Sequence, residues 1–175
     1  MERKSPLNTF IPYLTLYNAL LQLSNFATNH NDSNLTNQLA NLIANLKAPS
    51  NQKTPDPHIP EIGSHIDKTY IVRDEHTAAS LGHPDKSVQV LGSPQLGLWF
   101  ETTSSILLPT PSESVSHVGV GLLLHHLAPA KIDDLVTIRS TLVYASGRFA
   151  TFSCEAYVDE KMIGFGIHTR ALIYK

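Results

Sequence analysis

The sequence predicts an α+β domain in which a curved antiparallel sheet wraps around one long buried helix, with a helical arm ahead of it. Three observations favour this fold. One apolar helical segment at residues 94–107 precedes four segments that alternate apolar and polar residues or are rich in β-branched and aromatic ones. Composition changes near residue 60. The 175 residues are 42% hydrophobic and only 16% charged, which is typical of a chain that buries a core.

Residues 1–47 predict the helical arm, because apolar residues recur at helical spacing in an Asn-rich segment. Asp32 or Ser33 could cap its second helix. The arm is interpreted as a helical hairpin on the main domain or a dimer-stabilising element; the alternative is a lid or a partner-docking helix. Its two apolar stripes are Phe10, Tyr13, Leu14, Tyr17, Leu20 and Leu21, and Leu35, Leu39, Leu42, Ile43 and Leu46.

Residues 48–60 contain four prolines among polar residues and predict an extended linker, which leaves residues 61–175 as the compact unit. This unit is expected to open with a strand at 66–72, a short helical turn at 76–82 and a strand-like piece at 87–91.

The main helix is expected at residues 94–107, with Ser93 as its N-cap and Pro94 in the first helical position. Its apolar residues cover much of the circumference, which predicts burial on most sides. They are Leu96, Leu98, Trp99, Phe100, Ile106 and Leu107.

Strands follow at 115–124, 135–144, 149–158 and 162–174, with tight turns at 146–147 and 159–161. We expect these strands to form an antiparallel meander. A long apolar helix enclosed by such a curved sheet is the hotdog fold.

Composition excludes several classes of protein. The net charge of −2 argues against nucleic-acid and polybasic membrane-surface binding. A single cysteine, Cys154, excludes an internal disulfide framework and a Cys-based zinc site, and the nine histidines lack zinc-protease spacing, so no metal is expected. The N-terminal segment has no uninterrupted apolar run, so we expect no signal peptide, no membrane span and a cytoplasmic location.

Three side chains could carry chemistry. Ser93 precedes the helix, Glu101 lies in it among apolar residues, and His126 closes an apolar strand. A hydroxyl, a carboxylate and a base suffice for acyl transfer or thioester hydrolysis, whereas their structural alternatives are a helix cap, a rim residue and a satisfied histidine. Ser93 and Glu101 are eight residues apart, about 12 Å along a helix. A shared site therefore draws on two subunits or on a substrate that spans the gap, and both imply a dimer.

Two further segments bear on this site. Gly119 and Gly121 lie within a strand pattern, which indicates a β-bulge or a close backbone approach. His168 and Arg170 are two residues apart, so they share one side of the last strand, where His168 lines or buttresses the site. His117 opens a strand, and the sequence does not determine which side it faces.

These residues together resemble the fluoroacetyl-CoA thioesterase-like hotdog family over residues 61–175. Four motifs carry the resemblance in the right order and spacing. They are Val88–Glu101, Val118-Gly119, His126-Leu-Ala-Pro129 and Ile163–Arg170, the last with Gly-x-His-x-Arg. Two departures are Ser93, where the family more often has Thr, and residues 1–60, which have no counterpart in the minimal family domain.

The resemblance implies hydrolysis of an acyl-CoA or carrier-bound thioester by a homodimer, with coenzyme A as part of the substrate and no other cofactor. It implies catalytic roles for Ser93, Glu101 and His126. It implies substrate contact through Gly119 at the acyl pocket and Arg170 near the thioester or CoA, with His168 as a further candidate. Two alternatives stay open: a non-hydrolytic biosynthetic enzyme such as a dehydratase or cyclase, and a non-catalytic acyl-binding or scaffold dimer.

Overall fold

A computed structural model describes residues 33–34, 37–38 and 53–175 of the chain, which divides into two units, residues 1–53 and 54–175. In the first unit, residues 33–34 and 37–38 are helical and exposed, and Gln38 donates a hydrogen bond to Asn34 one turn earlier. The apolar stripes expected at 10–21 and 35–46 lie almost entirely outside the described residues. The helical arm and its boundary with the linker therefore stay predictions.

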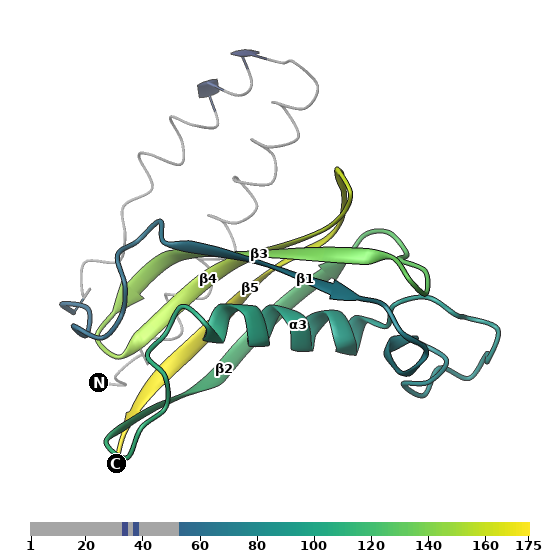
Figure 1. Cartoon of the computed structure of the whole chain (residues 1–175). Helices are drawn as coiled ribbons and strands as arrows, with labels where there is room; N and C mark the ends of the chain where they lie inside the picture. The colour runs from purple at the N-terminus through teal and green to yellow at the C-terminus, as the bar shows by residue number, and fades with distance from the viewer. Residues whose placement is uncertain (1–32, 35–36, 39–52) are drawn as a thin grey trace, which may run out of the picture. The chain divides into compact units, whose positions relative to one another are not determined.

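The second unit is one five-stranded antiparallel sheet with a long helix against it (Figure 1). The sheet order is β1-β3-β4-β5-β2. The elements are β1 (His65–Ile71), the 3₁₀ turn η1 (Asp74–His76), α3 (Ser93–Ser105), β2 (Val115–His126), β3 (Leu135–Ser146), β4 (Phe149–Val158) and β5 (Lys161–Tyr174). The predicted fold class is confirmed, and the predicted strands match these bounds within two residues.

The strand order corrects the expected four-stranded meander. Only β3, β4 and β5 follow one another through short turns, where Gly147 and Asp159 adopt positive φ angles. β2 pairs instead with β5 at the far edge, and β1 pairs with β3 at the other edge. Residues 127–134 therefore pass from one side of the sheet to the other. The backbone contact of Leu91 with Ala130 ties this crossing to the entry of α3.

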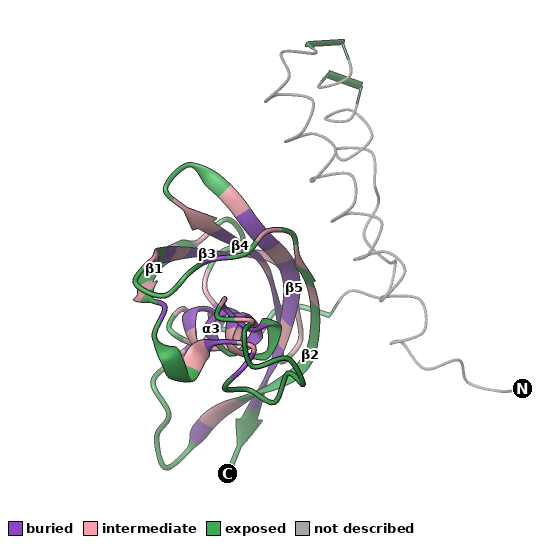
Figure 2. Cartoon of the chain, turned by 90° about the vertical axis from the view of Figure 1, so that its right-hand side faces the viewer, coloured by how far each residue is buried: buried purple, intermediate pink, exposed green. Residues whose placement is uncertain are grey.

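α3 lies within the curve of the sheet and contributes the centre of the core (Figure 2). Leu96 and Phe100 are fully buried against β5. Gly164 and Gly166 make this approach possible, because a Cβ at either position would lie 2.9 Å from Leu96 Cδ2 or 3.2 Å from Phe100 Cε2. Helix and sheet are thus packed at a distance that only glycine allows on β5.

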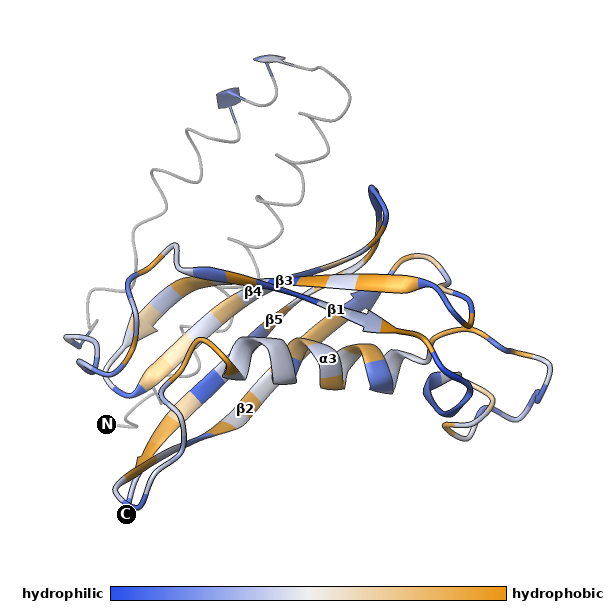
Figure 3. Ribbon diagram, viewed as in Figure 1, coloured by the Kyte–Doolittle hydropathy of each residue, from blue (hydrophilic) through white to orange (hydrophobic). Residues whose placement is uncertain are grey.

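Two expectations for α3 were wrong. Gly92, with an extended backbone, is the N-cap, and Ser93 is the first helical residue and makes no capping hydrogen bond. Leu98 and Ile106 are not buried; they are 54% and 47% exposed. Hydrophobic residues also extend along the edge strand β2, where several are exposed (Figure 3).

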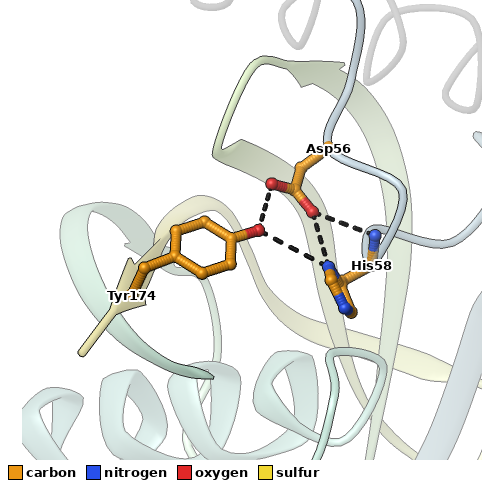
Figure 4. Close-up of polar contacts among 3 residues, drawn as sticks. All are labelled: Asp56, His58 and Tyr174. Atoms are coloured by element: carbon orange, nitrogen blue, oxygen red, sulfur yellow. Dashed lines mark hydrogen bonds and ion pairs between the residues drawn. The ribbon is translucent and has the colours of Figure 1, made fainter. Parts of the chain in front are cut away.

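The segment that enters the second unit is fixed to the sheet at residues 56–58 (Figure 4). The Asp56 amide donates to the Gly147 carbonyl at 2.8 Å, and its carboxylate accepts from Tyr174 and contacts His58 Nδ1 at 3.0 Å. Burial opposes ionisation of Asp56, but the hydrogen bonds from Tyr174 and His58 outweigh it and lower the pKa of Asp56. Among the described residues, no helix has the length and apolar character needed to cross a membrane.

Candidate active site

Three residues on one stripe of α3 face β2. Ser93, Gly97 and Glu101 follow one another at intervals of four, so they lie on the same helix face. Ser93 contacts His126, Gly97 lies against Leu122, and Glu101 lies against Gly119. The stripe therefore runs along β2, and its two polar members stand at opposite ends.

The first polar contact is the Ser93–His126 pair. Ser93 Oγ is 3.0 Å from His126 Nδ1. Because Gly92 is the helix cap, the Ser93 hydroxyl is available to the imidazole rather than to the helix backbone. Burial lowers the pKa of His126, and the Ala128 backbone offsets part of this effect, so the ring is held toward its neutral, basic form. This is the arrangement of a hydroxyl beside a general base.

The N-terminus of α3 offers fewer donors than a typical helix. Pro94 has no N–H, and the amides of Gln95 and Leu96 both donate to the Gly92 carbonyl. Within the described part of the chain, the Ser93 amide is the first-turn donor that has no acceptor. It therefore is the backbone group that could stabilise an oxyanion beside the Ser93–His126 pair.

The second polar contact is the Glu101 cluster, which we define as Glu101, His117, Gly119, His168 and Arg170. A Cβ on Gly119 would lie 3.1 Å from both Glu101 Oε2 and His168 Cε1, so the carboxylate and the imidazole both lie over this glycine. Gly119 pairs with Arg170 across the sheet, and His168 lies two residues before Arg170 on the same face.

Arg170 is buried and holds the Glu101 cluster together. Its Nη1 donates to the Glu101 carbonyl at 3.3 Å and to His168 Nε2 at 3.0 Å, and its Nε donates to His117 Nδ1 at 3.2 Å. His168 Nδ1 contacts the Gly121 carbonyl at 3.0 Å. Burial lowers the pKa of Arg170, while the Glu101 carboxylate favours its charged form.

The structure thus brings together five of the six predicted side chains in two groups, and Gly119 joins the second by its missing side chain. Ser93 contacts His126, and Glu101 lies with Gly119, His168 and Arg170, but the two groups are about two helical turns apart within one chain. His117 was not among the predicted site residues. Its position two residues before Gly119 on one strand was the available signal, because alternate residues share a face.

The second unit of the chain matches a known protein family. Residues 72–175, more than half of the chain, match the family model of the fluoroacetyl-CoA-specific thioesterase. The match includes every member of the Ser93–His126 pair and the Glu101 cluster. No curated protein sequence matches the chain.

Solved structures share the fold. A fluoroacetyl-CoA-specific thioesterase point mutant in complex with fluoroacetate and CoA is 20% identical, with a TM-score of 0.59 over 66% of this chain and 96% of that one. A hot-dog-like protein from Thermanaerovibrio acidaminovorans is 20% identical, with a TM-score of 0.59 over 65% and 84%. A thioesterase superfamily member from Thermus thermophilus is 22% identical, with a TM-score of 0.60 over 69% and 88%.

Proposed function

Because the chain belongs to the fluoroacetyl-CoA-specific thioesterase family and is a thioesterase-like hydrolase, we propose that it hydrolyses an acyl-CoA or carrier-bound thioester at a site completed by a second copy of the chain. The observation that carries this proposal is the Glu101 carboxylate, which lies against Gly119 with a buried arginine beside it. A carboxylate in that setting can attack the carbonyl carbon of a thioester or position a water molecule beside it, and the missing side chain of Gly119 leaves room for that carboxylate over the strand.

Hydrolysis breaks the bond between the acyl carbon and sulfur, transfers the hydroxyl of water to the acyl carbon, and releases the thiol with a proton. Glu101 attacks the carbonyl or positions the water, and His126 acts as base and stabiliser. Ser93 supplies a hydroxyl beside His126, at 3.0 Å, and its amide supplies one oxyanion donor. The roles of Glu101 and His126 require that both reach the same thioester.

A dimer through β2 supplies this proximity. β2 is a twelve-residue edge strand whose exposed apolar side chains include Val120 and Leu122. The exposed Leu98 of α3 is the residue after Gly97, which lies against Leu122. Long apolar edge strands are normally covered. Antiparallel pairing of two such edges about a two-fold axis brings the His126 end of one copy alongside the Gly119 end of the other.

Release of free thiol from a panel of acyl-CoA thioesters tests the reaction. We expect activity on at least one member, and a loss of at least about a thousandfold in kcat for Glu101→Gln with retained folding. Absence of thiol release from every acyl-CoA and acyl-carrier thioester, or full activity of Glu101→Gln, would refute the proposal.

Mixing two inactive variants tests the composite site. Glu101→Gln and His126→Asn chains, refolded together, form mixed dimers with one intact site if each site takes Glu101 from one copy and His126 from the other. Random pairing then restores about a quarter of the wild-type activity. If both residues act within one chain, every site in the mixture carries a substitution and no activity returns.

A further inference from the structure

Arg170 is a buried cation that is held by neutral groups. The ion pairs among residues 53–175 do not include it, although Glu101 is near enough to favour its charged form. A guanidinium has five N–H donors. Three of them are used, by His117, by His168 and by the Glu101 carbonyl. Both remaining N–H groups are on Nη2, which makes no hydrogen bond to any described residue.

The partners of the two imidazoles fix their proton positions. Arginine Nε can only donate, so His117 Nδ1 must accept and its proton lies on Nε2. The Gly121 carbonyl can only accept, so His168 carries its proton on Nδ1 and accepts from Arg170 through Nε2. Both rings are therefore neutral and present a lone pair to Arg170, in opposite tautomers.

We propose that His117 and His168 are positioning residues that clamp Arg170 in one orientation, so that its free Nη2 group can donate hydrogen bonds to the thioester at the Glu101 cluster. This proposal rests on the proposed function. The guanidinium is planar and rigid, so fixing Nε and Nη1 also fixes Nη2. The two imidazoles come from different strands, His117 from β2 and His168 from β5. The clamp therefore also joins the edge strand to its neighbour beside Glu101.

The clamp depends on neutral imidazoles. Protonation would place a second N–H on each ring, directed at the N–H groups of Arg170, and would add positive charge beside a buried cation. Burial and the charge of Arg170 lower the pKa of both histidines. The other charged group that faces them is Glu101 of α3, which favours protonation of His168. The β4 residues paired with His168 and Arg170 are Phe152 and Ala150, which carry no charge.

Two substitutions at each histidine distinguish the loss of the hydrogen-bond acceptor from the loss of side-chain volume. At position 117, His117→Asn keeps an acceptor near the Nδ1 position, and His117→Leu removes it. At position 168, His168→Gln keeps an acceptor near the Nε2 position, and His168→Leu removes it. His65→Leu is the control, because His65 is exposed on β1, at the opposite edge of the sheet from β2.

We expect each leucine variant at positions 117 and 168 to lose about tenfold to a hundredfold in kcat/KM, and the Asn and Gln variants to recover most of it. When kcat/KM is plotted against pH, its fall on the acid side should be less steep in the Asn and Gln variants, because their amide acceptors do not titrate. Equal losses in the leucine and amide variants, or a fall on the acid side that all variants share with wild type, would overturn the clamp.

Nitrogen NMR of the full chain tests the clamp independently of turnover. The Arg170 Nε–H signal, assigned by its loss in Arg170→Lys, should be protected from exchange in wild type and His117→Asn and lost in His117→Leu. The ring nitrogens should report neutral His117 and His168 in opposite tautomers at neutral pH. An unprotected Nε–H or a protonated ring would refute the clamp, whatever the activity. These signals in a chain that releases no thiol would instead refute only the thioesterase function and the catalytic use of Nη2.

Discussion

A single methyl group on Gly119 should damage the site without damaging the fold. The alanine Cβ would lie 3.1 Å from Glu101 Oε2 and 3.1 Å from His168 Cε1, closer than ordinary van der Waals contact. Gly119 does not adopt a positive φ angle, so alanine introduces no backbone strain. The two neighbours must each retreat by a few tenths of an ångström, and both belong to the Glu101 cluster.

The size of the effect follows from how freely each neighbour can retreat. Glu101 can move its carboxylate by small torsional changes, but His168 is held at 3.0 Å by both the Gly121 carbonyl and Arg170. A misplacement of about 1 Å can cost a hundredfold in rate, so a few tenths should cost about tenfold in kcat/KM, or about 1.4 kcal/mol of transition-state stabilisation. The free energy of unfolding should change by less than about 1 kcal/mol.

Two other glycines provide matched comparisons. A Cβ on Gly121, on the same strand, meets no atom within 4 Å, and alanine retains the carbonyl that His168 contacts. A Cβ on Gly166 would lie 2.3 Å from the Leu123 carbonyl oxygen, so Gly166→Ala must disturb the pairing of β2 with β5. We expect Gly166→Ala to lose about 3 kcal/mol of stability through overpacking.

The assay combines thiol-release kinetics with thermal unfolding for all three variants. The expected result is a kcat/KM about tenfold lower in Gly119→Ala than in Gly121→Ala, with similar melting temperatures, and a clearly lower melting temperature for Gly166→Ala. If Gly119→Ala and Gly121→Ala have equal kcat/KM, then the packing of Glu101 and His168 against Gly119 is not part of the working site.

Three further predictions follow from single contacts. Ser93→Ala should lower kcat/KM about tenfold or more, because it removes the hydroxyl beside His126. It should change the free energy of unfolding by less than about 1 kcal/mol, because Gly92 rather than Ser93 caps α3, and a large fall in its melting temperature would contradict that expectation. Ser93→Thr should retain activity. Burial lowers the pKa of three histidines below the ordinary 6.5, so below about pH 6.5 the unfolded chain binds more protons than the folded chain, and the free energy of unfolding should fall as the pH drops. Urea unfolding at neutral and acid pH would measure this, and a free energy of unfolding that does not change with pH would refute it. The three histidines are His117, His126 and His168. Burial raises the pKa of the Cys154 thiol to about 11, so it should resist iodoacetamide in the native chain and react in urea, as measured by mass spectrometry; rapid labelling of native protein would contradict its burial.

Local sequence patterns predicted the elements well, because strand alternation and turn residues are local properties. Residues 149–158 form β4 as predicted, and Gly147 and Asp159 adopt the positive φ angles that their turns need. The strand order was not predictable in the same way. β2 pairs with β5 rather than with β3, and nothing in the eight residues between β2 and β3 encodes how far the chain crosses. That choice follows from wrapping the sheet around α3.

The site was predicted as a set of residues but not as a geometry. Ser93 was expected to cap the helix, yet one residue of difference in the helix start releases its hydroxyl to His126. Leu98 was expected to be buried, because hydrophobicity alone does not distinguish the core from an apolar surface. Alternation along the strand could have placed His117 on the face of Gly119, but its partner Arg170 follows only from the β2–β5 pairing.

The bulge in β2 explains how one strand serves both parts of the site. β2 pairs regularly with β5 on both sides of Val120, but the register shifts between Gly119 and Gly121. Without this extra residue, strict alternation would place His117 and Gly119 on one face and His126 on the other. The shift restores His126 to the helix side, where it meets Ser93, while Gly119 still faces Glu101. The Gly-Val-Gly sequence is therefore best understood as the feature that aligns both ends of β2 with α3, since glycines on either side of Val120 allow the strand to bend without a side chain intruding on Glu101.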